Sequence, residues 1–163
     1  MIRTLFGRFS QDYDSHMQET NHVNVQRQIL ETFLPVIRGN ILDIATGTGT
    51  VAKYLKENAT CEIFAIDFSP EMIQKARENS TGINFHVADA NALPFPDNSF
   101  DAITCSYGFY WFSERLRVIS EIKRVLKPDG ILILLEEEFK PGFEPKPRFA
   151  SNADYLSELA NVE

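Results

Sequence analysis

The chain has few of the features that mark secreted, membrane-bound or metal-dependent proteins. Its 163 residues include only two cysteines, Cys61 and Cys105, too few for a disulfide framework or a cysteine-based zinc site. The longest fully apolar run, Ile131 to Leu135, is far shorter than the roughly 20 residues of a membrane-spanning helix. The first residues contain no apolar stretch typical of a secretion signal. These absences predict a cytoplasmic protein with reduced thiols, no membrane span and no metal site.

Positive charge is also scarce. The 16 Lys and Arg residues are outnumbered by 23 Asp and Glu residues, which gives a net charge of −7. An acidic surface disfavours a nucleic-acid binder and a polybasic membrane anchor. The length and the ordinary proportion of hydrophobic residues favour a single globular domain over residues 1–163.

The hydrophobic pattern alternates between short apolar runs and helical spacing. Each run has the length of a buried strand, and the five lie at 41–44, 62–66, 83–87, 100–105 and 131–135. Helices between strands imply a parallel sheet that is covered on both faces. We therefore predict an α/β doubly wound, mainly parallel sheet with strand order 3-2-1-4-5, whose ligands bind beyond the carboxyl ends of the strands.

Local signals place the helices and turns between these strands. Asn21 is a plausible N-cap for a helix that Pro35 closes, and Ser69 followed by Pro70 is a strong helix start. Ser113 is expected to cap the helix before the last strand. The segment 127–130, Lys-Pro-Asp-Gly, is expected to form a turn.

The first strand leads into a glycine-rich turn, Thr46-Gly47-Thr48-Gly49, that can carry a ligand or be a plain strand-to-helix connection. Gly47-x-Gly49-x-x-Ala52 also fits a dinucleotide fingerprint, so an NAD-dependent oxidoreductase is an alternative. Asp43 argues against it, because a carboxylate just before the loop repels a pyrophosphate and favours a cation such as an α-amino group.

The next strand ends supply further candidate groups. Asp67 can accept hydrogen bonds from both hydroxyls of a ribose, or it can cap the following helix. Since Ser69 already suits that cap, we expect Asp67 to be free for a ligand. Asp89 can accept a hydrogen bond from an exocyclic amine, and the Ala90 N–H can reach a ring nitrogen. The carbonyl groups around Cys105 would face the same pocket.

Four segments resemble the motifs of class I S-adenosylmethionine-dependent methyltransferases. Residues 41–49 resemble the family's first motif, and residues 67–72, from Asp67 to Met72, resemble its second. Asp89-Ala90 with the loop 93–101 is similar to the small-molecule branch that includes the ubiquinone/menaquinone C-methyltransferases. Residues 121–130 match the segment before the fifth strand, so the resemblance spans about residues 38–136.

The resemblance implies a binding site for S-adenosylmethionine and for its product S-adenosylhomocysteine. Asp43 and the loop Ala45, Thr46, Gly47 and Gly49 would hold the methionine part, and Asp67 would hold the ribose. Phe68 and Met72 would lie near the adenine face, Asp89 and Ala90 at its edge, and the Cys105 carbonyl would accept from the methionine amino group. Ala45 stands where many members have glycine, and its methyl group is tolerated if its φ is negative.

The resemblance also implies a division of the domain: an N-terminal helical lid over residues 1–37, a cofactor-binding core over 38–136, and a loop with a helix over 137–163. Tyr13-Asp14 resembles a lid motif of the family. His16 and His22 are candidate bases or surface residues, and His86 is expected to be structural. Residues 136–138, three glutamates, are expected to be a solvated charge run. No catalytic residue is assigned.

Aromatic residues after the fourth strand are candidates for the acceptor pocket. Tyr107, Tyr110 and Trp111 could form its wall or pack against a helix. The usual last two strands of the family's sheet are expected to be missing, which predicts a truncated chain or a short variant. An open edge of the fifth strand favours a homo-oligomer.

The sequence therefore leaves three functional hypotheses. The first is a methyltransferase that acts on a small molecule by in-line methyl transfer. The second is a non-catalytic S-adenosylmethionine-binding module, and the third is the NAD-dependent oxidoreductase.

Overall fold

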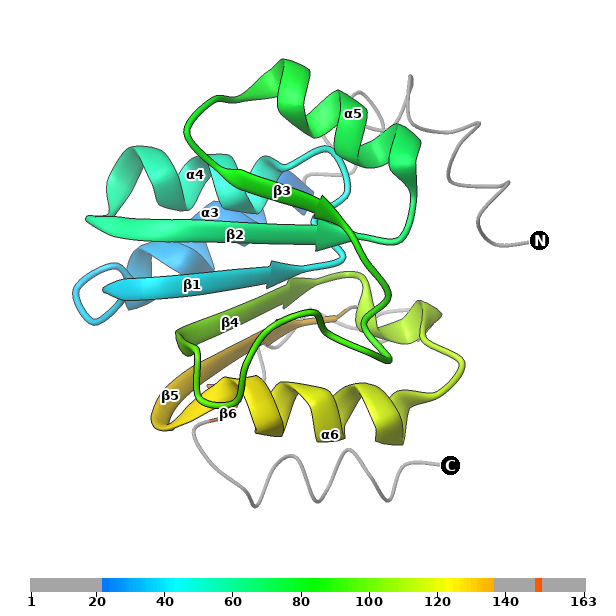
Figure 1. Cartoon of the computed structure of the whole chain (residues 1–163). Helices are drawn as coiled ribbons and strands as arrows, with labels where there is room; N and C mark the ends of the chain where they lie inside the picture. Colours follow the sequence, from blue (N-terminus) through cyan, green and yellow to red (C-terminus); the bar gives the residue numbers. More distant parts are fainter. Residues whose placement is uncertain (1–21, 137–148, 151–163) are drawn as a thin grey trace, which may run out of the picture.

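The computed structural model describes residues 22–136 and 149–150, which form one sheet with helices on both faces (Figure 1). The expected lid motif Tyr13-Asp14, His16 and the helix predicted after Asn152 lie outside these residues. In chain order the elements are α3 (His22–Phe33), β1 (Gly39–Ile44), α4 (Thr50–Asn58), β2 (Cys61–Asp67), α5 (Pro70–Asn79), β3 (Asn84–Val87), β4 (Phe100–Ser106), the 3₁₀ helix η1 (Phe109–Trp111), α6 (Arg115–Val125), β5 (Leu126–Leu135) and β6 (Phe149–Ala150).

The strand order is β3-β2-β1-β4-β5-β6, so the predicted order 3-2-1-4-5 of the parallel strands is confirmed. A sixth, antiparallel strand was not expected. β6 pairs with β5 at Leu132 and Ile133, and it covers part of the edge that the sequence left open. Pairing between distant segments carries no local sequence signal, which is why this two-residue strand was missed.

Two local expectations need correction. Segment 127–130 does not separate α6 from the last strand, because β5 begins at Leu126 and includes it. The irregularity appears instead as a register shift, with Phe100 opposite Leu126 and Ala102 opposite Ile131. Glu114, not Ser113, occupies the N-cap position of α6, and its side chain makes no cap hydrogen bond. The Ser69 cap of α5 is confirmed, since its side chain accepts from the Met72 N–H.

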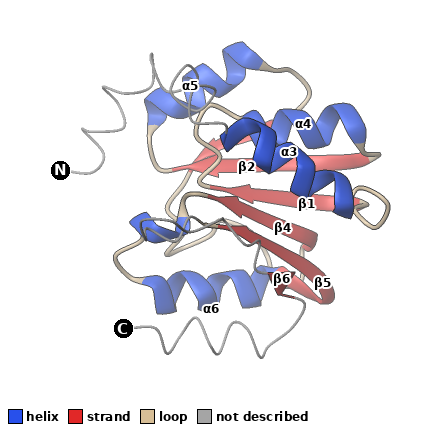
Figure 2. Ribbon diagram, turned by 180° about the vertical axis from the view of Figure 1, so that it is seen from behind, coloured by secondary structure: helices blue, strands red, loops and turns tan. Residues whose placement is uncertain are grey.

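The two faces of the sheet carry separate hydrophobic cores. One core joins α3, α4 and α5 to the sheet, with Leu30, Leu55 and Ile73 fully buried (Figure 2). The other joins α6, η1 and the loop after β3 to the opposite face, through residues such as Ile122, Phe109 and Leu93. These two cores fix the strand ends at which the candidate site lies.

α3 lies across the sheet with its first turn near the carboxyl ends of the strands (Figure 2). The His22 ring makes an edge-to-face contact with Tyr107, just beyond β4, at a centroid distance of 4.7 Å. Eight residues later, Leu30 is in the core beneath the helix. α3 therefore closes one side of the region where ligands bind in doubly wound sheets.

Candidate functional site at the carboxyl ends of the strands

Asp43 is buried in the centre of the candidate site. It is 1% exposed, and its two carboxylate oxygens accept hydrogen bonds of 2.6 Å from the hydroxyls of Thr46 and Thr104. Burial raises the pKa of Asp43 to about 6, although the hydroxyls of Thr104 and Thr46 oppose this shift. Thr104 was missed in the sequence, but its position two residues before the end of β4 placed it beside β1.

The loop after β1 turns through three residues with left-handed backbone. Gly47 and Gly49 have φ values of 56° and 85°, and Ala45 has a φ of 56°. The condition under which the Ala45 methyl group is easily tolerated, a negative φ, is therefore not met. A left-handed conformation costs a non-glycine residue about 1–2 kcal/mol, which here must be offset by the surrounding contacts. A Cβ at Gly49 would lie 3.2 Å from both Ala76 Cβ and Phe85 Cζ, a tight approach that together with the φ of 85° favours glycine.

Asp67 also differs from expectation, because it is not free. It is 7% exposed, and its oxygens accept hydrogen bonds of 2.9 Å from the N–H groups of Gly47 and Ser69. Burial raises its pKa, and these backbone hydrogen bonds oppose the shift. Asp67 thus ties the glycine loop to the start of α5. The Phe68 N–H also opposes the pKa shift, and the two carboxylate oxygens, with about four lone pairs in all, can still accept a further donor.

The N–H groups of this loop do not form a phosphate cradle. The Thr46 N–H donates to the Ile66 carbonyl at 2.9 Å, and the Gly49 N–H donates to the Thr46 carbonyl at 3.0 Å. The Gly47 N–H is used by Asp67. Three donors that a pyrophosphate would need are therefore satisfied within the protein, and the buried Asp43 precedes them. The dinucleotide alternative loses its physical basis.

The ends of β2 and β3 place the other predicted cofactor residues together on one side of the loop. Met72 is 1% exposed and Ala90 is 6% exposed, whereas Phe68 is half-buried. Asp89 is exposed, and its Oδ1 accepts from the N–H and side-chain amide of Asn91 at 2.9 and 3.0 Å. One oxygen of Asp89 thus serves the local turn.

Negative charge surrounds the end of β4. Cys105 is fully buried, and burial raises the pKa of its thiol well above the usual value. Glu136, Asp43 and Asp67 raise that pKa further, because a nearby carboxylate disfavours a thiolate. Such a site favours a positively charged ligand. Cys61 and Cys105 are both free thiols.

The sequence had suggested that Glu136 belongs to a solvated charge run, but the structure shows otherwise. Its carboxylate accepts hydrogen bonds from the N–H groups of Phe109 and Tyr110 at 2.8 and 3.3 Å, and it fixes η1 to the end of β5. Burial raises the pKa of Glu136 to about 7. Glu137 and Glu138 lie outside the described residues.

The aromatic and histidine candidates divide between the site and the surface. Tyr107, with a φ of 54°, is half-buried beside His22. Tyr110 and Trp111 are 56% and 43% exposed. His86 is exposed on β3, and its ring contacts Phe95 edge-to-face at a centroid distance of 6.3 Å.

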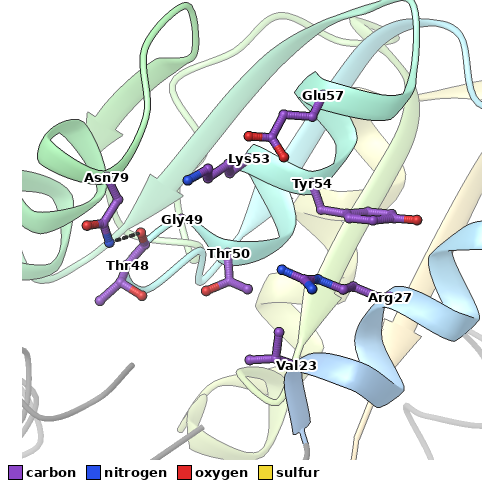
Figure 3. Close-up of a pocket in the computed structure, with 9 residues that line it drawn as sticks. All are labelled: Val23, Arg27, Thr48, Gly49, Thr50, Lys53, Tyr54, Glu57 and Asn79. Atoms are coloured by element: carbon purple, nitrogen blue, oxygen red, sulfur yellow. Dashed lines mark hydrogen bonds between the residues drawn. The ribbon is translucent and has the colours of Figure 1, made fainter. Parts of the chain in front are cut away.

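A cavity of about 260 Å³ lies between α3, α4 and the end of α5 (Figure 3). Arg27 and Lys53 line it together with Thr48, whose carbonyl accepts from the Asn79 side chain at 3.2 Å. The sequence did not foresee this cavity. It borders the glycine loop through Thr48, Gly49 and Thr50 but contains none of the predicted cofactor residues except Gly49.

None of the helices among the described residues is long and apolar enough to cross a membrane. Among the same residues, no group of three His, Cys, Asp or Glu side chains could hold a metal ion.

Comparison with known proteins gives matches over the same region. A family model described as "Methyltransferase domain" matches residues 42–134. A demethylmenaquinone methyltransferase from Thermotoga maritima is 42% identical over 139 residues, which cover 81% of this chain and 59% of that protein. A ubiquinone/menaquinone biosynthesis C-methyltransferase from Citrifermentans bemidjiense is 35% identical over 147 residues, covering 83% of this chain and 62% of the relative. The chain thus spans about three fifths of the length of these curated relatives.

A solved structure supports the fold. A protein assigned as an S-adenosyl-L-methionine-dependent methyltransferase from Methanococcus maripaludis superposes with a TM-score of 0.73 at 22% identity, over 80% of this chain and 63% of that chain. At that identity the likeness shows the fold alone. Together with the family match, it confirms the resemblance that the motifs indicated.

Proposed function

Because the chain belongs to the methyltransferase domain family, we propose that it binds S-adenosylmethionine and transfers the methyl group to a small-molecule acceptor. The two curated relatives described above are named for demethylmenaquinone and for ubiquinone/menaquinone biosynthesis. An aromatic precursor of a quinone is therefore the first acceptor to test.

The observation that carries this proposal is the group of buried carboxylates around the glycine loop. Asp43 and Asp67 stand at the ends of two adjacent strands, and both act with Glu136 on the thiol of Cys105. A donor that carries a sulfonium and an ammonium group suits such a negative site, whereas a pyrophosphate does not.

Each predicted residue then receives a role. The loop Ala45–Gly49 with Asp43 and the Cys105 carbonyl holds the methionine part, and Asp67 accepts from the ribose through its remaining lone-pair capacity. Phe68 and Met72 lie near the adenine face, while Asp89 and the Ala90 N–H contact its edge. These assignments are our proposal for the cofactor site.

The protein's chemical task is alignment. When bound, S-adenosylmethionine supplies a methyl group that is already activated by the sulfonium. Holding a nucleophile in line with that carbon can contribute about 7–11 kcal/mol. α3 and η1 flank the end of β4 from the two sides, so they are placed to hold an acceptor and to exclude water.

Calorimetric titration tests the proposal. We expect the protein to bind S-adenosylhomocysteine and S-adenosylmethionine but not NAD. Asp67→Ala and the milder Asp67→Asn should weaken S-adenosylhomocysteine by about 10- to 100-fold, the effect of one hydrogen bond to a charged group. Asp129→Ala is the matched control, since Asp129 is exposed near the amino end of β5, and it should leave binding unchanged.

Two further results decide between the hypotheses. Tighter binding of NAD would overturn the proposal. Binding of S-adenosylhomocysteine without methyl transfer to a panel of quinone precursors and other small molecules would favour the non-catalytic module. The cytoplasmic location and the homo-oligomer that we predicted from the sequence remain predictions.

A further inference from the structure

Gln26 on α3 is a buried polar residue with an unmet hydrogen-bonding need. It is 4% exposed, and its Oε1 atom makes no hydrogen bond to any residue that the structure describes. Burying an amide oxygen without a partner is costly, so such atoms usually accept from a water or a ligand. The sequence drew no attention to Gln26.

Its position on α3 directs this residue toward the candidate site. His22, Gln26 and Leu30 are spaced by four residues and therefore share one face of the helix. The first of them contacts Tyr107 beyond β4, and the last is fully buried in the core under α3. Gln26 lies between these two contacts, so its side chain is directed at the carboxyl half of the sheet.

The sheet presents polar groups on this same face. Alternation along β4 places Ala102, Thr104 and Ser106 on one side, and Ala102 belongs to the core under α3. Asp43 lies on that side too, because it accepts from Thr104. The Ser106 Oγ is buried, and it is a second atom without a hydrogen-bond partner among the described residues.

The groups gathered here are predominantly acceptors. An amide oxygen, a carboxylate and a hydroxyl with two lone pairs are suited to an ammonium group, which has three donors and a positive charge. We propose that Gln26 Oε1, together with Asp43 and Ser106, binds the α-ammonium group of the methionine part, so that α3 helps to select a ligand with an amino acid tail. This inference rests on the proposed function and adds to its site two residues that the sequence had not assigned.

Three ligands distinguish the binding of the ammonium group from the binding of the rest of the ligand. S-adenosylhomocysteine carries the ammonium and carboxylate, its decarboxylated analogue 5′-(3-aminopropylthio)adenosine keeps only the ammonium, and 5′-methylthioadenosine has neither. We expect Gln26→Leu to weaken the first two by about 10-fold or more, as for a lost hydrogen bond to a charged group, and to leave the third unchanged. Calorimetry measures all three.

The matched control is Gln28→Leu, because Gln28 is exposed on the same helix, and all three affinities should stay as in the wild type. The melting temperature of Gln26→Leu should not fall, since the substitution removes a buried amide oxygen that has no partner among the described residues. Gln26→Met, which keeps the length of the side chain, gives the same test without branching.

The outcomes distinguish this inference from the proposed function. A wild type that binds none of the three ligands contradicts both. Unchanged affinities in Gln26→Leu and Gln26→Met, with a wild type that binds S-adenosylhomocysteine, contradict the inference alone. An equal loss for all three ligands also contradicts it, because the effect would then not depend on the ammonium group.

Discussion

At the scale of single residues, Ala45 carries backbone strain. Its left-handed backbone, with a φ of 56°, is required by the turn that follows β1 and is unusual for a residue with a Cβ. Nothing in the local sequence excludes the alternative of a negative φ. The strain arises from the tertiary arrangement, because the next residue must donate its N–H to the Ile66 carbonyl on β2.

We predict that Ala45→Gly stabilises the folded protein. Glycine removes the left-handed penalty of about 1–2 kcal/mol. Its greater conformational freedom in the unfolded chain lowers the free energy of unfolding by about 0.4–1 kcal/mol. The net expectation is a gain of about 0.5–1 kcal/mol in the free energy of unfolding, measured by chemical denaturation. Ala59→Gly is the control, because Ala59 has an extended backbone with a φ of −131°, and it should destabilise.

A double-mutant cycle tests the same geometry from the other side. A Cβ added at Gly108 would lie 2.5 Å from Ala45 Cβ, so Gly108→Ala should be destabilising in the wild type. The loss should be smaller in the Ala45→Gly background, where the clashing atom is gone. Equal losses in the two backgrounds, or a less stable Ala45→Gly protein, would contradict the prediction.

At the scale of elements, Arg124 joins α6 to the loop that follows β3. Its guanidinium donates to the carbonyls of Phe95 and Leu93 at 2.7 and 3.0 Å, and to the carboxylates of Asp97 and Glu121. Glu121 in turn accepts from the Leu93 N–H at 2.7 Å. The loop begins at Asp89 and Ala90, so this contact supports the proposed adenine edge of the site.

We predict that Arg124→Lys loosens this loop, because an ammonium group cannot reproduce the planar fork of the guanidinium. The lost bonds to backbone carbonyls should lower the free energy of unfolding by about 1–2 kcal/mol. Amide hydrogen exchange should quicken over residues 93–99, and S-adenosylhomocysteine should bind more weakly. Arg117→Lys on the same helix is the control, since that side chain is 62% exposed and makes one bond to a carbonyl, of Asn91.

Equal hydrogen exchange over residues 93–99 in Arg124→Lys and Arg117→Lys would contradict this prediction. That would mean that the loop is held by its apolar contacts, such as Leu93 in the core, rather than by Arg124.

The same elements show what sequence reasoning could and could not reach. The apolar runs and helix spacing predicted the strands, and parallel pairing then brought Asp43 and Asp67 together at one edge of the sheet. The hydrogen-bond partners of these carboxylates could not be predicted from the sequence. Asp67 seemed free because Ser69 suited the cap, yet it accepts from the nearby Ser69 N–H and also from the N–H of Gly47, which lies 20 residues earlier and is brought close only by the fold. Gln26 drew no attention and Glu136 was expected in a solvated charge run, since burial is decided by distant segments.

At the scale of the whole molecule, buried carboxyl groups set the response to pH. Burial raises the pKa of Asp43 from 3.8 to about 6 and that of Glu136 from 4.5 to about 7. At pH values between the ordinary and the raised pKa of each group, the folded protein therefore binds more protons than the unfolded chain. Where the folded state binds more protons, the free energy of unfolding decreases as pH rises.

Other carboxyl groups act in the opposite sense at lower pH. Lys127 and the Asn40 N–H lower the pKa of Asp101, and Arg124 lowers that of Glu121. Their stabilising effect is complete above the ordinary pKa of a carboxyl group and is lost on acidification below it. Both side chains are partly exposed, so these contributions are small.

We therefore predict that the protein is most stable in mildly acidic solution, near pH 4–5, and that it loses stability as the pH rises to 7. Asp43 alone can contribute up to about 3 kcal/mol to this loss, the value of a shift of about two pKa units. Denaturant unfolding at pH 4, 5, 6 and 7 measures the curve. The double variant Asp43→Asn/Glu136→Gln cannot titrate at these two positions, so its curve should be flatter over the same range. A wild-type curve that is level or rises from pH 5 to 7 would contradict the prediction, and so would an undiminished slope in the double variant, because self-repulsion of the net charge of −7 would then explain the whole effect.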